Sequence, residues 1–409
     1  MLGDALAIDV PDDAREFGFS LAHHDGRLLV GAPGTGSEAG AAFLIEGSIV
    51  RTVVEGAAPG DRAGHSVDVG PAGWVVGAPH RGDRVVIAAA EIGQGSVHLE
   101  DGSSWLGREG DCFGSSVAVA DDGRVLAGAP CRGSQAFQHE SLPRPMLVFG
   151  PGAVTVIDRG APVATVDGAE PWDQLGHSVA WMGDAAVTGA PDYFGGDWIN
   201  QLAQGEVHVF RDPPQGELTS ADADLTIAGG QGSRELHDDH GWAVATGDLD
   251  GDGSLDLVTG SPEFSDFERQ GGAWMFSAPS DGDHYAWDAD AALAGATQPG
   301  INARAGAALA VGDVNCDGDA DLVLGAPLRT TDADRAGAVY VVFGPIAAWE
   351  PLAEADRIYE GRGLGTRAGT AVAVGDEDRD GCADILIGAP GANGGEGAVY
   401  VVSSAPSTD

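Results

Sequence analysis

The sequence predicts an all-β fold: a seven-bladed β-propeller of four-stranded antiparallel blades, with an N-terminal strand completing the last blade. Three observations predict it. One phrase of strand and turn residues occurs seven times along the 409 residues, roughly 45 to 70 residues apart, which is a period typical of propeller blades. Glycine is abundant, with 65 residues, as many turns require. Finally, the last copy lacks an outer strand, and a spare strand precedes the first copy.

Each copy begins with a residue followed by Gly, continues through a strand of small residues and a tight turn, and ends an apolar strand with Gly-Ala-Pro or Gly-Ser-Pro. In the sixth copy, residues 308–311 are small enough for the crowded propeller axis, and residues 322–324 suit a strand buried on both faces. Pro327 then ends the strand because it has no N–H to donate. The ending glycines are Gly31, Gly77, Gly128, Gly189, Gly260, Gly325 and Gly388.

Third and fourth strands follow each ending. In the sixth copy we expect them at 337–343 and 356–359, with equivalent third strands at 41–45, 205–210, 272–276 and 397–402, and weaker ones around 85–87 and 146–149. Blades should end near residues 56, 108, 168, 229, 295 and 361, with 362–403 and a strand at 5–10 forming the last. Such closure removes exposed sheet edges. An open array of hairpins or two sandwiches is the alternative, but it would make the spare strand a coincidence.

Charge narrows the possible partners. The 63 acidic residues outnumber 21 basic ones, giving a net charge of −42, and all basic residues are Arg. This field repels nucleic acid and anionic lipid, and it suits divalent cations or a salt-rich setting. Salt adaptation and a GC-rich genome both remain explanations for the absence of Lys. No apolar run is long enough for a membrane span, and the first residues lack the features of a signal peptide. We therefore expect a mature fragment of an extracellular or cell-surface protein.

In the last three copies the tight turn becomes a nine-position acidic loop, at 248–256, 313–321 and 376–384. Asp or Asn occupies positions 1, 3 and 5, Gly occupies position 6, and Asp occupies position 9. Calcium takes about six to eight oxygen ligands. Side chains at positions 1, 3 and 5 converge if the loop curls, position 7 offers its backbone carbonyl, and position 9 closes the shell. Without an ion, such crowded carboxylates raise one another's pKa values.

These loops predict three Ca²⁺ sites, and the alternative, a solvated Asp-Gly turn, does not explain three copies in register. The middle site carries Asn315 in place of Asp and should be the weakest. The expected ligands are Asp248, Asp250, Asp252, Ser254 and Asp256; Asp313, Asn315, Asp317, Asp319 and Asp321; and Asp376, Asp378, Asp380, Cys382 and Asp384.

The Phe-Gly…Gly-Ala-Pro phrase, with Asp-x-Asp-x-Asp-Gly-x-x-Asp between its halves, resembles the FG-GAP repeat of integrin α-subunit propellers and their prokaryotic relatives. The resemblance covers nearly the whole chain and includes the confinement of acidic loops to the last blades. The sequence shows neither the leg domains nor the membrane helix of an integrin α-subunit, so the resemblance does not imply integrin-like signalling. The sequence departs from the repeat at Ala63, Leu175, His240, Ala305 and Ala368 in place of Phe, and at Ser261 in place of Ala.

The connections between second and third strands hold the long insertions, at 131–145, 192–204 and 263–270. They lie on the opposite face from the acidic loops, and by resemblance this is the face on which integrins hold ligands. Aromatic residues in such loops either form a binding surface or pack over the blade edges, and both interpretations stay open. The candidates are Tyr193, Phe194, Trp198, Phe264 and Phe267.

Four cysteines favour an oxidising compartment. Cys112 and Cys131 flank two antiparallel neighbours of one blade, so we expect a disulfide between them. Cys316 and Cys382 occupy unlike positions in adjacent acidic loops, and the sequence leaves their pairing open.

Three other short motifs are weaker evidence for function. Residues 81–83 read Arg-Gly-Asp, an integrin ligand motif, although chance explains a copy in so Gly-, Arg- and Asp-rich a chain. Gly-His-Ser at 64–66 and 176–178 falls on inner strands and is expected to be structural. The segment 237–240 could bind a metal, but a solvated loop explains it better.

We therefore predict a calcium-stabilised extracellular binding or adhesion module, non-catalytic and monomeric, with a protein or glycan ligand on the insertion-bearing face. The alternatives are a carbohydrate-binding propeller and, with less support, a polysaccharide-processing enzyme.

Overall fold

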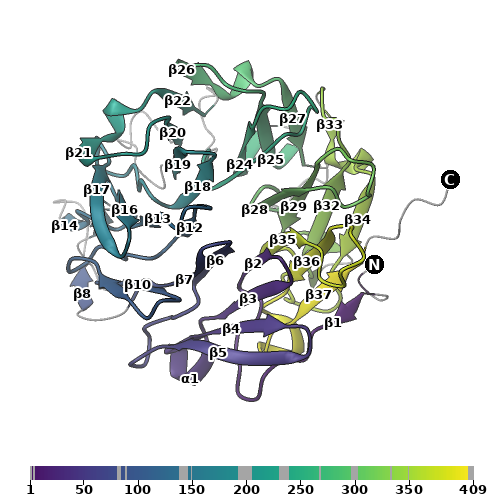
Figure 1. The fold of residues 1–409 in the computed structure, drawn as a ribbon, viewed down its shortest axis with the longest axis horizontal. Coiled ribbons are helices and arrows are strands. Elements are labelled where there is room, and N and C mark those ends of the chain that lie inside the picture. The colour runs from purple at the N-terminus through teal and green to yellow at the C-terminus, as the bar shows by residue number, and fades with distance from the viewer. Residues whose placement is uncertain are drawn as a thin grey trace.

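Seven β-sheets surround a central axis in the computed structural model (Figure 1). Each sheet places its first strand at the axis and its fourth strand near the rim, so the predicted propeller is confirmed. The structure describes all residues except 1, 3–4, 81–83, 88–89, 138–145, 149, 192–204, 230–238, 267–268, 296–302, 332–333, 349 and 404–409.

The first four blades run in chain order around the ring. Blade 1 is β2 (Ser20–His24), β3 (Arg27–Ala32), β4 (Ala41–Glu46) and β5 (Ile49–Glu55). Blade 2 is β6 (Ser66–Gly70), β7 (Gly73–Ala78), β10 (Ser96–Leu99) and β11 (Ser104–Leu106). Blade 3 is β12 (Val117–Val119), β13 (Val125–Gly128), β16 (Ala153–Asp158) and β17 (Ala161–Asp167). Blade 4 is β18 (Ser178–Met182), β19 (Ala185–Ala190), β20 (Glu206–Phe210) and β22 (Leu225–Ala228).

The last three blades carry the acidic loops. Blade 5 is β23 (Ala243–Gly247), β24 (Asp256–Asp266), β25 (Arg269–Phe276) and β27 (Ala291–Ala294). Blade 6 is β28 (Ala308–Gly312), β29 (Asp321–Ala326), β32 (Ala338–Val342) and β34 (Arg357–Glu360). Blade 7 is β35 (Ala371–Gly375), β36 (Asp384–Gly388), β37 (Val399–Val402) and β1 (Leu6–Ala7).

The N-terminal strand closes the ring as predicted. Strand β1 pairs antiparallel with β37, with Leu6 opposite Val401 and Ala7 opposite Tyr400. The pairing continues at Ile8, whose N–H donates to the carbonyl of Val399 at 2.9 Å. Residues from the two ends of the sequence therefore share one sheet.

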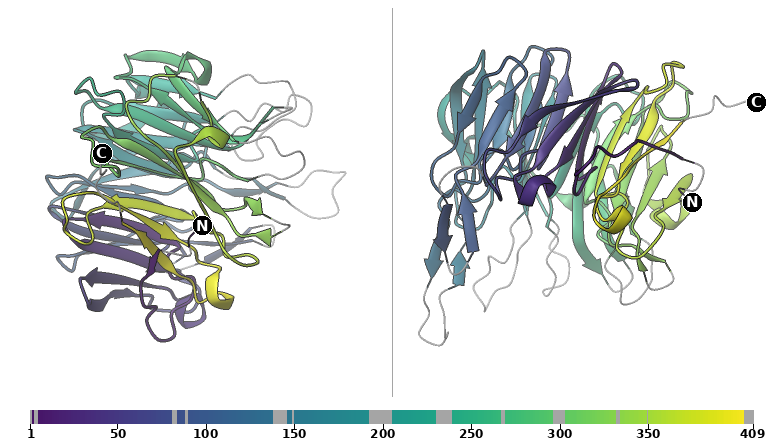
Figure 2. Two further views of the ribbon diagram at one scale, coloured as in Figure 1. Left: turned by 90° about the vertical axis from the view of Figure 1, so that its right-hand side faces the viewer. Right: turned by 90° about the horizontal axis from the view of Figure 1, so that it is seen from below.

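The predicted third strands of blades 2 and 3 are wrong. The segments around 85–87 and 146–149 belong instead to separate two-stranded hairpins, β8 (Arg84–Ile87) with β9 (Ala90–Gly93) and β14 (Gln135–Phe137) with β15 (Met146–Val148). Both hairpins interrupt the connection between second and third strands and extend from one face of the ring (Figure 2). A third hairpin, β30 (Thr330–Thr331) with β31 (Asp334–Arg335), occupies this connection in blade 6.

Three blades gain an unpredicted fifth strand. Strands β21 (Gly216–Thr219), β26 (Gly282–Tyr285) and β33 (Glu350–Pro351) pair in parallel with the outer strands of blades 3, 4 and 5. Each leads into a short 3₁₀ helix, at Ser220–Asp222, Ala286–Asp288 or Leu352–Glu354. The chain then enters the outer strand of the following blade, so these segments join neighbouring blades at the rim. Other helices among the described residues include α1 (Thr35–Glu38) and a 3₁₀ turn at Ala392–Gly394.

Backbone contacts between glycines explain the repeated phrase. In blade 4 the N–H of Gly176 donates to the carbonyl of Gly189 at 3.1 Å, which ties the start of the repeat to its Gly-Ala-Pro ending. The ending then lies against the next blade, because a Cβ added at Gly189 would lie 1.9 Å from the carbonyl oxygen of Gly241. The same two contacts recur in every blade, and a Cβ added at the last ending, Gly388, would lie 2.0 Å from the carbonyl oxygen of Gly18 in blade 1. Glycine is thus required because the backbones of adjacent blades touch.

Side chains fill the remaining space between blades. The buried apolar residues that the structure describes form seven clusters, one for each pair of adjacent blades. In blades 1 to 4, a Ser at or just before the start of the inner strand donates its hydroxyl to the carbonyl of the repeat's first glycine in the next blade, as Ser178 does to Gly241 at 2.8 Å. Blades 5 to 7 have Ala at this position. None of the described helices has the length and hydropathy needed to cross a membrane.

Candidate metal centres in the acidic loops

The three acidic loops connect the first and second strands of blades 5, 6 and 7. Each follows a strand ending in Gly, at Gly247, Gly312 and Gly375, and each leads into a strand beginning with Asp. Because blade strands are antiparallel, these loops lie at the opposite end of the blades from the hairpins β8–β9 and β14–β15. The predicted separation of the acidic loops from the insertions therefore holds in the fold.

The blade 5 loop is held closed by its own carboxylates. Both oxygens of Asp248 accept backbone N–H groups, Oδ1 from Gly251 and Oδ2 from Gly253, each at 2.9 Å. Position 6 adopts a positive φ of 87° at Gly253, so the predicted sharp bend at this glycine is confirmed. Oδ1 of Asp250 accepts the N–H of Asp252 at 3.0 Å. The loop thus wraps its backbone around the side chains at positions 1 and 3.

The other two loops repeat this arrangement. Asp313 and Asp376, at position 1, each accept the N–H of the position 6 glycine at 3.0 Å. Gly318 and Gly381 have φ values of 97° and 95°. The shared geometry shows that the three loops are one structural motif built three times.

The carboxylate at position 9 is fully buried in all three loops, at Asp256, Asp321 and Asp384. Asp321 accepts N–H groups from Val314 at 2.7 Å and Gly344 at 2.9 Å, so it fastens the loop to the connection after β32. Burial raises the pKa of Asp321 to about 6, with smaller contributions in the same direction from other carboxylates of the loop. Burial likewise raises the pKa of Asp256. A nearby cation would stabilise the charged form of both carboxylates.

Two loops bring three carboxylates to a common centre. Carboxylate oxygens of Asp248, Asp250 and Asp256 lie within 4.8 Å of one another. The equivalent group in blade 7 is Asp376, Asp378 and Asp384. Oxygens around one Ca²⁺ lie about 2.3–2.6 Å from the ion, and hence at most about 5 Å apart. Positions 1, 3 and 9 of these loops therefore fit a hard divalent cation.

The middle loop differs as its sequence suggests. The amide nitrogen of Asn315 donates to Oδ2 of Asp317 at 2.9 Å, while its Oδ1 accepts the N–H of Asp317. Substitution of Asp by Asn thus removes one charge and directs a donor into the loop. This loop has the poorest donor set of the three for a cation.

The carboxylates at position 5 lie differently from the prediction. Oδ1 of Asp252 accepts the N–H of Ser254 at 2.7 Å, and Asp380 similarly accepts from Cys382 at 2.9 Å. Neither aspartate belongs to the groups of convergent oxygens. In the middle loop, Asp317 also accepts the N–H of position 7, at Asp319. Position 5 therefore shapes the loop in the structure, and its role as a ligand stays a prediction.

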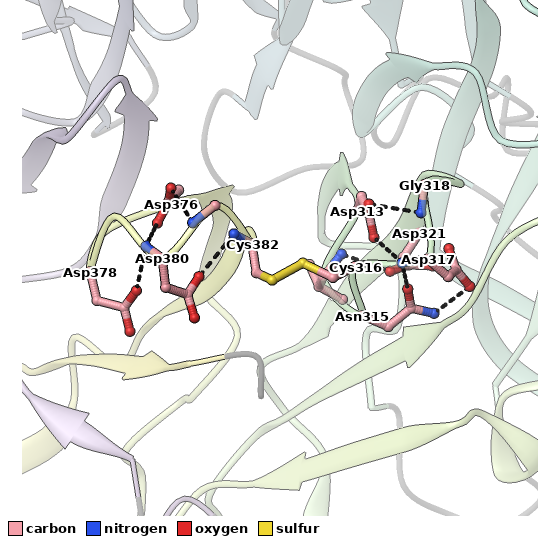
Figure 3. Close-up of a disulfide and its surroundings, with 12 residues drawn as sticks. Asp313, Asn315, Cys316, Asp317, Gly318, Asp321, Asp376, Asp378, Asp380 and Cys382 are labelled. Atoms are coloured by element: carbon pink, nitrogen blue, oxygen red, sulfur yellow. Dashed lines mark hydrogen bonds between the residues drawn. A yellow bond between two sulfur atoms is a disulfide. The ribbon is translucent and has the colours of Figure 1, made fainter. Parts of the chain in front are cut away.

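Two disulfides use all four cysteines. Cys112 bonds to Cys131 within blade 3, with their Cα atoms 5.4 Å apart, the pair expected from the sequence. Cys316 bonds to Cys382 with a Cα separation of 5.5 Å and joins the acidic loops of blades 6 and 7 (Figure 3). The sequence left this second pair open because its members occupy positions 4 and 7 of different loops. Only the ring brings the two loops side by side.

Most aromatic candidates for a ligand face, Tyr193, Phe194, Trp198 and Phe267, lie outside the described residues, as does Arg-Gly-Asp at 81–83. Phe264 is described and is half-buried, with its ring edge-on to Trp274 at 5.2 Å. The expected loop at 263–270 is instead an extension of the β24–β25 hairpin, in which Ser265 pairs with Gln270. Phe264 thus packs on its own blade.

The Gly-His-Ser segments are built into the ring. Ser66 and Ser178 donate their hydroxyls to backbone carbonyls of the next blade, and His65 and His177 are hydrogen-bonded to the carbonyls of Ser115 and Trp242. Burial lowers the pKa of His65 to about 3 and that of His177 to about 4. These histidines are neutral structural groups.

Two departures from the repeat compensate each other. His240 replaces the expected Phe and Ser261 replaces the expected Ala, and the His240 ring nitrogen Nδ1 lies 3.0 Å from the Ser261 hydroxyl. The same hydroxyl accepts the indole N–H of Trp274 at 3.1 Å. Burial lowers the pKa of His240 to about 3, so it is neutral and is a structural partner of Ser261. Of the 237–240 motif, residues 237 and 238 lie outside the described part of the chain. Asp239 and His240 are both buried, so the expected solvated loop is wrong at these two residues.

The fold and its repeated glycine contacts define a seven-bladed β-propeller that is similar to integrin α-subunit propellers and carries FG-GAP repeats in its last three blades. The FG-GAP repeat family matches residues 240–274, 305–342 and 368–402, which extend from before the first strand into or through the third strand of the three blades that carry acidic loops. Earlier blades keep the backbone contacts of the repeat without its acidic loop.

Comparison with curated proteins agrees with this class. Chicken integrin alpha-V is 28% identical over 71% of this chain and 27% of its own length. Human integrin alpha-IIb is 32% identical over 55% of this chain and 21% of its own length. Rat phosphatidylinositol-glycan-specific phospholipase D is 37% identical over 24% of this chain and 13% of its own length. The chain thus spans about a quarter or less of the length of these relatives.

Proposed function

We propose that this propeller is a non-catalytic, extracellular adhesion-type binding module, stabilised by Ca²⁺ in the loops of blades 5, 6 and 7. The similarity to integrin α-subunits supports the binding role. The observation that supports calcium most directly is the convergence of oxygens from positions 1, 3 and 9. The ion would supply charge compensation for the buried position 9 carboxylates, and the chain's own residues would hold the loop around it.

The proposed role of the ion is to make three loops rigid. Position 1 already accepts loop N–H groups, and position 9 accepts N–H groups both from the loop and from the connection after the third strand. A cation at their centre would therefore hold both ends of the loop together. If free Ca²⁺ exceeds the dissociation constant tenfold, each site adds about 1.4 kcal/mol, and three sites add about 4 kcal/mol. For a chain of 409 residues this corresponds to a rise in melting temperature of about 5 °C.

Thermal unfolding in millimolar CaCl₂ and in excess EGTA tests this role. Chelation should lower the melting temperature by several degrees, and Asp250→Ala combined with Asp378→Ala should reproduce most of that loss. Asp121→Ala is the matched control, since Asp121 is an exposed aspartate in the corresponding turn of blade 3. A melting temperature that does not respond to chelation would contradict calcium stabilisation.

We further propose that the ligand binds on the face formed by the connections between strands 2 and 3 and between adjacent blades. The hairpins β8–β9 and β14–β15 project from this face, away from the acidic loops (Figure 2). Binding of the purified chain to immobilised extracellular proteins and to a glycan array distinguishes a protein from a glycan ligand. Trp198→Ala should weaken binding, whereas Asp252→Ala on the opposite face should not abolish it. Equal loss in both variants would argue against this face.

A further inference from the structure

The disulfide Cys316–Cys382 connects the metal-loop backbones of two different blades. Cys316 lies between Asn315 and Asp317, at the centre of the blade 6 loop (Figure 3). Cys382 follows the positive-φ glycine of the blade 7 loop, and its N–H donates to Asp380 at 2.9 Å. A movement of either loop when it closes around a cation would therefore be transmitted to the other loop through one covalent bond.

A second contact strengthens the connection. The N–H of Ala383, beside the buried Asp384, donates to the carbonyl of Asp313 at 3.2 Å. Asp313 is position 1 of the blade 6 loop, and its side chain accepts the N–H groups of Asp317 and Gly318. The two loops thus meet at position 1 and position 4 on one side and at positions 7 and 8 on the other.

The loop of blade 5 provides an internal reference. It shares with its neighbours the hydrogen bonds from position 6 to position 1 and from position 5 to position 3, but it contains no cysteine. All four cysteines of the chain are used in the two disulfides. The linked loops are also unequal, because Asn315 leaves blade 6 with three carboxylates at positions 1, 3, 5 and 9, whereas blade 7 has four. A weak site is thereby joined to a stronger one.

We infer that the loops of blades 6 and 7 form one composite two-cation site, in which occupancy of blade 7 raises the affinity of blade 6 through Cys316–Cys382. This inference rests on the proposed calcium function. A coupled pair of sites is reciprocal, so the cation in either loop should favour the other. Reduction by a dithiol uncouples them: the S–S bond breaks, Cys316 and Cys382 become thiols by gaining two electrons and two protons, and the dithiol becomes a disulfide.

Calcium titration of the full chain tests the coupling. An Asp250→Ala background removes the blade 5 loop from the titration, leaving the two linked sites. Within it, Cys316→Ser with Cys382→Ser should weaken binding at the weaker site by about tenfold and abolish cooperativity. Cys112→Ser with Cys131→Ser, which removes the other disulfide, should leave both sites unchanged.

Reduction kinetics of the unmodified chain provide a second test that does not depend on a folded variant. Dithiothreitol is added with CaCl₂ or with EGTA, and alkylated Cys316 and Cys382 are followed by mass spectrometry. Calcium should slow their reduction several-fold relative to that of Cys112–Cys131. Equal calcium affinity without the disulfide, or equal reduction rates with and without calcium, would overturn the coupling and leave calcium binding intact. Absence of calcium binding in the unmodified chain would overturn the coupling and the proposed function together.

Discussion

The contact between adjacent repeats predicts the effect of one added methyl group. In Gly189→Ala, the new Cβ would lie 1.9 Å from the Gly241 carbonyl oxygen and 2.4 Å from the Ser178 hydroxyl. Ordinary van der Waals contact begins at 3.4 Å, so blades 4 and 5 must separate by about 1.5 Å at this point. The obstructing atom is backbone, so no side-chain rotation relieves the overlap. The separation also stretches the hydrogen bond from Ser178 to Gly241.

Overpacking of this kind costs about 1–3 kcal/mol, and we expect the upper end because two sheets must move. With an unfolding entropy of about 2.1 cal/mol/K per residue, a loss of about 3 kcal/mol lowers the melting temperature of 409 residues by about 3–4 °C. Differential scanning calorimetry in CaCl₂ measures the shift. Gly70→Ala is the control, because its nearest neighbour is a Val119 methyl group at 3.2 Å that can rotate away. Equal melting temperatures for Gly189→Ala and the unmodified chain would refute close backbone packing between blades.

Three further predictions concern buried polar groups and ring closure. Burial lowers the pKa of His177 to about 4 in the folded state, below the ordinary value of about 6.5. The free energy of unfolding should therefore be highest above about pH 6.5 and fall towards pH 4, by about 3 kcal/mol at most. His177→Phe should make the free energy of urea unfolding less dependent on pH between these values. Ser261→Ala alone should cost about 1–3 kcal/mol in urea unfolding because it removes the partner of His240 and Trp274, whereas adding His240→Phe should recover part of that loss. Deleting residues 1–10 should expose the edge of β37 and produce concentration-dependent association in analytical ultracentrifugation, while an unchanged monomer would contradict the closure.

The repeated phrase allowed the ring to be predicted because its residues make the contacts that define the fold. Glycines at both ends of each phrase touch across every blade boundary, so the periodicity of the sequence reports the periodicity of the structure. The spare N-terminal strand was equally informative, since a propeller with an incomplete last blade leaves one place for it.

The third strands of blades 2 and 3 were predicted wrongly because β-propensity identifies a strand but does not show which strand it pairs with. The segment at 85–87 does form a strand, but it pairs within its own hairpin. A better signal was a glycine before each true third strand, such as Gly95, which has positive φ and bridges Phe113 of the next blade. The equivalent Gly152 bridges Leu175. This glycine recurs in all seven repeats.

Other features depended on neighbours that the sequence does not show. The fifth strands pair in parallel with a different blade. An aspartate just before each following outer strand, at Asp224, Asp290 and Asp356, accepts a backbone N–H group at the start of the connection. Likewise, spacing identified the nine-position loops but could not decide which carboxylates converge. Position 5 turns back to its own loop, which only the backbone path reveals.

Joining Leu6 to Val401 in one sheet has a consequence for biosynthesis. Strand β1 is synthesised before the other described strands, whereas its pairing partner β37 is synthesised almost 400 residues later. Until then the nascent chain must hold β1 unpaired while six other sheets assemble. The seventh sheet therefore cannot be completed before β37 has been synthesised, and termination anywhere before β37 would leave the earlier blades in an open arc.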